Sequence, residues 1–153
     1  MSIKTANGSA AYAFGQQTPD WSLPLITAPL ILTNALQADG FIAADNSYIW
    51  KADLLGVTQV RLTGIVKTVS ASANSPKIQL RYSPTYTTTV ASFLIMGSSS
   101  VEFSMFTGQA SADSGWIDLV PGAKINSCFL GLFNIGGDGA ADPAINAVTA
   151  HFR

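Results

Sequence analysis

Residues 77–83 constrain the fold most, because polar and apolar side chains alternate along them without exception. The apolar ones are Ile78, Leu80 and Tyr82. A period of two places every apolar side chain of a β-strand on one face. Similar alternation occurs at 57–67, 101–105 and 145–153. No segment of helical length carries the apolar stripe of an amphipathic helix, so we expect an all-β protein.

Short polar connections separate these segments. Residues 70–76 contain Ser, Ala, Asn and Pro and predict a hairpin that joins strands 57–67 and 77–83 as antiparallel neighbours. Residues 125–135 are apolar on both faces in their middle, which indicates a central strand covered on both sides. Residues 88–96 fit either a short helix or a strand, and we expect a strand.

Candidate strands at 21–26, 40–44 and 48–51 bring the total to about eight, the number in a jelly roll. The 153 residues therefore predict one antiparallel, jelly-roll-like β-sandwich at 21–153. Residues 1–20 show no period and predict an extended N-terminal arm.

The arm has few apolar residues with which to offset the entropy cost of ordering, so we expect it to order only against a partner. Its candidate anchors are Tyr12 and Phe14, followed by Trp21. In an extended chain these three rings are spread over roughly 30 Å, which suits successive pockets on a neighbouring subunit. The alternative is a flexible terminus without a binding role.

Charged residues make up 11% of the chain, against about 25% in ordinary domains. The net charge is -1, and neither sign is clustered, so nucleic acid and anionic membranes are not expected partners. A surface this poor in charge resembles the core of a protein interface. The single Cys excludes an intrachain disulfide, and together with the single His it excludes a zinc site of the common Cys/His kind within one chain.

The N-terminal sequence lacks the basic stretch and apolar core of a secretory signal, so we expect synthesis in the cytoplasm without export. The most apolar run, 23–32, is interrupted by Pro24 and Pro29. It is also much shorter than the roughly 20 residues that span a bilayer. We therefore expect no membrane segment.

Residues suited to catalysis are few. The only imidazole is His151, on an alternating strand, where a surface or interface role is expected rather than a catalytic triad. Glu102 and Asp118 are the only carboxylates inside expected strands, and nothing local favours a glycosidase pair. P-loop and dinucleotide-binding glycine patterns are absent. We expect no catalytic residue, no cofactor and no enzymatic activity.

A glycine-rich loop offers the best oxygen ligands for an ion. Asn134, Asp138 and Asp142 are weak calcium candidates, because calcium prefers carboxylate and carbonyl oxygens. The loop lacks the acidic spacing of an EF-hand, and its glycines also suit a flexible connection. We expect folding to require no divalent metal.

Aromatic residues in loops are the remaining indication of binding. Tyr86 lies in a polar stretch where a ring has little core to enter, so it is a candidate contact for a ligand or receptor. Burial at the edge of the sandwich is expected for Trp21, Trp50 and Trp116.

Residues 57–153 combine a hairpin near Ser-Pro, the turn Trp116 to Gly122, a doubly apolar strand and a final alternating strand. In this pattern the chain resembles small jelly-roll proteins of tailed-phage virions, such as capsid decoration (cement) proteins and fibre tips. The resemblance implies a non-enzymatic structural protein of the virion. It also implies a symmetric homo-oligomer, foremost a trimer, bound to the major capsid protein or another virion protein.

Two other function classes stay open. The first is a carbohydrate- or receptor-binding module that uses Tyr86 and a Trp as stacking platforms. The second is a β-sandwich hydrolase, which the scarcity of catalytic residues disfavours.

Overall fold

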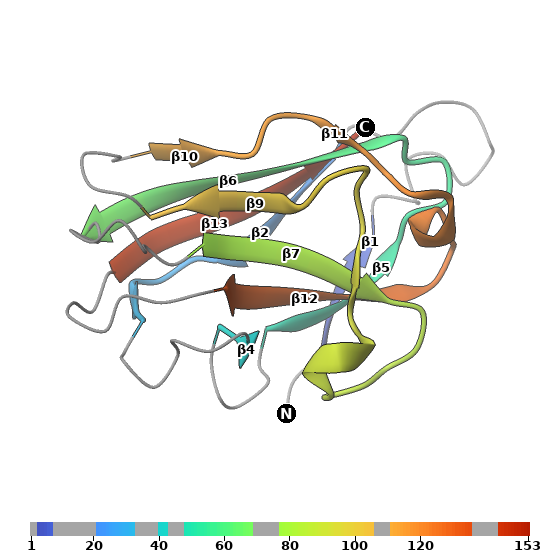
Figure 1. The fold of residues 1–153 in the computed structure, drawn as a ribbon, viewed down its shortest axis with the longest axis horizontal. Coiled ribbons are helices and arrows are strands. Elements are labelled where there is room, and N and C mark those ends of the chain that lie inside the picture. Colours follow the sequence, from blue (N-terminus) through green and yellow to red (C-terminus); the bar gives the residue numbers. More distant parts are fainter. Residues whose placement is uncertain are drawn as a thin grey trace.

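The computed structural model describes residues 3–7, 21–32, 40–42, 48–68, 77–105, 111–135 and 144–153. Within this part of the chain, thirteen strands form two sheets, which confirms the expected β-sandwich (Figure 1). Sheet A contains β1 (Ile3–Asn7), β4 (Gly40–Phe41), β5 (Ile49–Asp53), β7 (Lys77–Ser83), β8 (Leu94–Ile95), β9 (Val101–Ser104) and β12 (Cys128–Ile135). Sheet B contains β2 (Trp21–Ile26), β3 (Leu30–Ile31), β6 (Gln59–Thr68), β10 (Ser111–Asp113), β11 (Ile117–Asp118) and β13 (Ala144–Phe152). Two short 3₁₀ helices are η3 (Val90–Ser92) and η4 (Pro121–Ala123).

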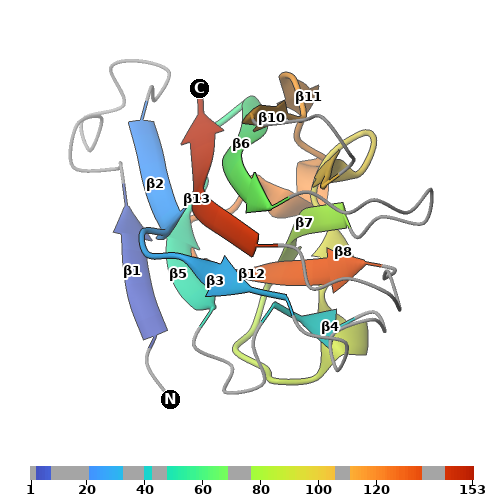
Figure 2. The same ribbon diagram turned by 90° about the vertical axis from the view of Figure 1, so that its left-hand side faces the viewer.

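The order of the strands is that of a jelly roll. Sheet B runs β2-β13-β6-β10, and sheet A runs β5-β12-β7-β9. Successive strands of the chain mostly alternate between the two sheets, as in two interleaved Greek keys. Figure 2 shows β2, β13 and β6 side by side. Among the residues that the structure describes, no helix is long and apolar enough to cross a membrane.

The predicted hairpin between strands 57–67 and 77–83 is wrong. The first segment is β6 of sheet B, and the second is β7 of sheet A. A polar connection rich in small residues predicts a turn but carries no information about which sheet the chain enters next. Residues 88–96 are only partly a strand, because η3 precedes the two residues of β8.

The main core lies between the sheets and draws on the alternating positions that the sequence predicted. Sheet A contributes Trp50, Leu80 and Leu130, which are fully buried against Leu62 and Phe152 of sheet B. One glycine lets the sheets approach closely. A Cβ at Gly64 of β6 would lie 2.5 Å from Cζ of Phe103 on β9, so the absence of a side chain makes room for this ring.

A second hydrophobic cluster covers the outer face of sheet A. Phe133 alternates with core residues of β12 and therefore points away from the main core, yet it has no exposed surface. Its ring stacks on Phe41 at a centroid distance of 4.7 Å and meets Phe93 edge-on at 5.1 Å. We call Phe41, Ile49, Phe93 and Phe133 the outer cluster. The cluster explains why β12, the predicted central strand, is apolar on both faces.

The described part of the N-terminal arm lies in sheet A. Strand β1 pairs with β5 in parallel, with Ile3 opposite Ile49 and Asn7 opposite Asp53. The sequence indicated an extended conformation here but not this partner. The arm's two predicted anchors, Tyr12 and Phe14, lie outside the described residues.

Candidate binding face

The outer face of sheet B carries the side chains that alternate with core residues along four strands. Along β6 and β13 the core positions include Val60, Leu62, Val148 and Ala150, so the positions between them face outward. The outward side chains are those of Ser22, Pro24, Arg61, Thr63, Ile65, Lys67, Ser111, Asp113, Ala147, Thr149 and His151. Most of them are small, hydroxylated or β-branched, and the charged side chains among them are those of Arg61, Lys67 and Asp113.

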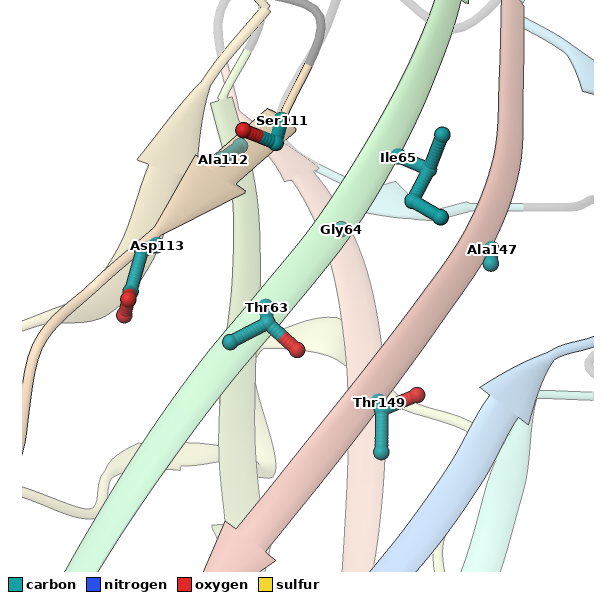
Figure 3. A pocket seen from close by; sticks show the side chains of 8 residues that line it. All are labelled: Thr63, Gly64, Ile65, Ser111, Ala112, Asp113, Ala147 and Thr149. Atoms are coloured by element: carbon teal, nitrogen blue, oxygen red, sulfur yellow. The ribbon is translucent and has the colours of Figure 1, made fainter.

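A shallow hollow of about 300 Å³ lies in this face between β10, β6 and β13 (Figure 3). The side chains of Thr63 and Thr149, each with a hydroxyl and a methyl group, line it together with the Ser111 hydroxyl, the Asp113 carboxylate and Ala147. Gly64, Ala112 and Ile65 complete the lining. The volume is at the lower end of the range of about 300–1,000 Å³ for ligand pockets, and the mixed lining suits a side chain better than a large polar ligand.

His151 lies beside the hollow and bridges three strands. Its Nδ1 is 2.9 Å from the hydroxyl of Ser22 on β2, and its Nε2 is 2.9 Å from the hydroxyl of Thr63 on β6. Each hydroxyl can donate or accept, so both the neutral and the protonated imidazole can be satisfied in this position. The hydrogen bonds of His151 therefore connect β2, β13 and β6 on the outer face of sheet B.

The charges next to His151 neutralise each other. The guanidinium of Arg61 donates to both carboxylate oxygens of Asp113, with Nε 2.9 Å from Oδ1, and the Gly115 N–H donates to the same carboxylate. The hydrogen bonds from Arg61 lower the pKa of Asp113 below its ordinary value. An ion pair between neighbouring strands leaves this part of the face without net charge.

A half-buried tryptophan closes one end of the face. The guanidinium carbon of Arg153 lies 4.1 Å from the ring centroid of Trp116. Arg153 also donates to Gln59, which in turn donates to Asp118, with donor–acceptor distances of 2.7 Å. Because a guanidinium covers the ring, Trp116 is a poor stacking platform for a sugar.

The arrangement around His151 lacks one part of a catalytic triad. In a triad the second ring nitrogen bonds a carboxylate that orients the imidazole, whereas here it bonds the hydroxyl of Thr63. The two strand carboxylates considered for a glycosidase pair lie in different sheets, because Glu102 is on β9 and Asp118 is on β11. Glu102 instead bonds Lys77 at 3.2 Å and Gln79 at 2.7 Å.

The other predicted site residues lie in separate places. Tyr86 is 38% exposed and meets Phe129 edge-on at 5.5 Å on the outer side of sheet A. Trp21 stacks on Phe152 at 4.4 Å, so its ring packs against the main core. Trp116 and Tyr86 lie on opposite sides of the sandwich, so they cannot stack together on one sugar ligand.

Of the three calcium candidates, only Asn134 belongs to the described residues. Asn134 is buried at the end of β12, whereas Asp138 and Asp142 lie outside the described residues. Within the described ranges, no group of three His, Cys, Asp or Glu side chains could hold a metal ion.

The sequence reasoning missed most residues of the face, although one signal was available. In the alternating pattern of β6, Ile65 stands where a polar residue is expected. Gly64, directly before it, stands where an apolar residue is expected. The hydroxyls of Ser22 and Thr63 carried no signal, because their approach to His151 depends on the pairing of distant strands.

No known family model, curated protein or solved structure matches this chain.

Proposed function

We propose that this chain is a non-enzymatic structural protein of a virion, foremost a capsid decoration protein, which acts as a symmetric oligomer. Its contact surface with another subunit is the outer face of sheet B. The proposal combines the resemblance to small jelly-roll proteins of tailed phages with the properties of this face.

The contrast between the two outer faces carries the proposal. Over β5 and β12, the outer face of sheet A is covered by the protein's own outer cluster, in which Phe133 is completely buried. The exposed apolar side chains Leu94 and Ile95 of this sheet belong to the two-residue edge strand β8. The outer face of sheet B instead exposes Ile65 in the middle of the sheet, at 55%, and Ile31 near its edge, at 58%. Exposed apolar side chains beside an ion pair that neutralises itself, here Arg61 with Asp113, favour contact with another protein.

The chemistry around His151 supports the non-enzymatic part of the proposal. Activation of Ser22 as a nucleophile requires a base whose orientation a third group holds. The group at Nε2 is a neutral hydroxyl, which does not stabilise an imidazolium as a carboxylate does.

The test is the composition of virus particles. Particles released by the strain that encodes this chain are purified on a density gradient, and their proteins are identified by mass spectrometry. We expect peptides of this chain to co-purify with the major capsid protein in a fixed ratio. Peptides found only in the cell lysate would contradict the virion assignment.

One observation favours a second candidate function, a carbohydrate- or receptor-binding module. Tyr86 exposes part of its ring on the side opposite the proposed contact face. A glycan array probed with the native chain and with Tyr86→Ala tests it. Binding that the substitution abolishes would favour this function, and an empty array would exclude glycans of the types displayed.

A further inference from the structure

Ile65 is the exposed apolar side chain in the middle of the outer face of sheet B. It is 55% exposed, although β6 is flanked by β10 on one side and β13 on the other. Its direct cross-strand neighbours are Ser111 and Ala147, both with small side chains. The isoleucine therefore stands above its surroundings as an isolated apolar projection.

The hollow in the same face begins at the base of this projection (Figure 3). Ala147 and the methyl groups of Thr63 and Thr149 provide apolar lining, and the volume of about 300 Å³ has room for a branched aliphatic side chain. A two-fold interface uses the same patch on both copies, so a projection beside a hollow of matching chemistry allows two reciprocal contacts.

We propose that the partner on this face is a second copy of this chain. In the pair, Ile65 of each copy enters the hollow of the other, and the two sheets B pack face to face. This inference rests on the proposed function and names the subunit that the face binds. It replaces the three-fold symmetry that the resemblance implied with a two-fold contact.

The charges of the face are compatible with such a pair. Arg61 and Asp113, at the edge of the hollow, are bonded to each other within one copy, so contact between two copies brings no unpaired charge of this pair into the interface. Lys67, two residues beyond Ile65, is exposed. In a pair whose β6 strands run in opposite directions, Lys67 approaches the ion pair of Arg61 and Asp113 in the other copy, which has no net charge and does not repel it.

The test measures mass by sedimentation velocity and light scattering on the full chain. We expect a two-fold assembly whose mass is halved by Ile65→Thr, which removes the projection and keeps a β-branched residue. Ala147→Leu, which fills the hollow, has the same expected effect. Each variant loses two contacts per pair, and we expect dimerisation to weaken about 100-fold if each contact contributes a factor of about ten.

A mixture of the two variants tests the reciprocity. The Ala147→Leu copy still has Ile65, and the Ile65→Thr copy still has an open hollow, so a mixed pair keeps one of the two contacts. We expect the mixed pair to form about 10-fold more tightly than either variant alone. A merely destabilising substitution would not be rescued by mixing.

Leu94→Thr is the matched control, because it removes an exposed apolar side chain from β8 of sheet A. We expect this variant to keep the native mass, and far-UV circular dichroism checks that every variant is folded. A monomeric native chain, or an odd-numbered oligomer that the two substitutions leave intact, overturns the proposal. The virion assignment fails separately, because particle composition and not mass tests it.

Discussion

Small buried residues determine how closely the layers of this protein pack. Gly64 gives space to Phe103 between the sheets, and Gly131 gives space to the outer cluster above β12. Cys128 fills a position of the main core with a small, soft side chain. Each of these residues is enclosed by other side chains, so a substitution at any of them changes the local packing.

Gly131→Ala is expected to destabilise the fold by about 1–3 kcal/mol through overpacking. The added Cβ would lie 2.6 Å from Cε2 of Phe133 and 2.8 Å from Cε1 of Phe93, so both rings have to move. Urea unfolding measures the change. The double variant Gly131→Ala/Phe93→Leu is expected to recover part of the loss, and a change below about 0.5 kcal/mol in the single variant would contradict the prediction.

Cys128 is expected to be unreactive in the native state. Burial, with a smaller contribution from Asp53, raises the pKa of its thiol to about 12, and the thiolate is the reactive form. A thiol reagent such as Ellman's reagent at pH 8 is expected to label the chain only as fast as it unfolds. Rapid labelling of the folded chain, in the absence of denaturant, would show that the core around β12 opens without global unfolding.

At the scale of elements, side-chain alternation predicted where strands lie but not what they pair with. Residues 77–83 of β7 follow the expected pattern, because one of their faces meets the main core. The partner of β6 was mispredicted, since the composition of a connection does not specify a sheet. The outer cluster was also missed, because Phe41 belongs to a two-residue strand and Phe93 to none. The binding face is less predictable still, since it is assembled from strands far apart in the sequence.

Strand β10 is a short element attached to β6 by three register pairs and by the ion pair between Arg61 and Asp113. Because the pKa of Asp113 is lowered in the folded state, its charge stabilises the fold above the unfolded-state pKa of about 3.9. This stabilisation is lost as the pH falls through the lowered pKa. Native protein is therefore expected to melt at a higher temperature than Asp113→Asn above about pH 4, and the difference is expected to vanish in stronger acid. Melting curves between pH 2 and 7 measure it; equal melting temperatures at pH 7 would contradict the prediction.

At the scale of the whole molecule, the outer cluster covers part of the outer face of sheet A, whereas the outer face of sheet B exposes Ile65 at its centre. Strand β1 lies at an edge of sheet A. Strand β1 pairs with β5, whose other edge pairs with β12. All strands of the two sheets except β1 belong to residues 21–153.

Deletion of residues 1–20 is expected to leave the sandwich folded, because β5 stays paired with β12. The deletion uncovers the main-chain groups of β5 along five residue pairs, so a lower melting temperature and stronger self-association are expected. Circular dichroism and light scattering measure both. Loss of the β-sheet spectrum on deletion would mean that the arm is an intrinsic part of the domain.

The position of β13 also determines when the protein can fold during its synthesis. In the described residues β2 pairs with β13 alone, and β13 separates it from β6. Between the synthesis of β2 and that of β13 the ribosome adds more than one hundred residues, which takes about 6 to 24 s at typical rates of 5–20 residues per second. During this interval the apolar side chains of β2 have no strand to pair with. We therefore expect the nascent chain to expose an extended apolar segment of the kind that chaperones bind, and sheet B to close only after β13 has left the ribosome.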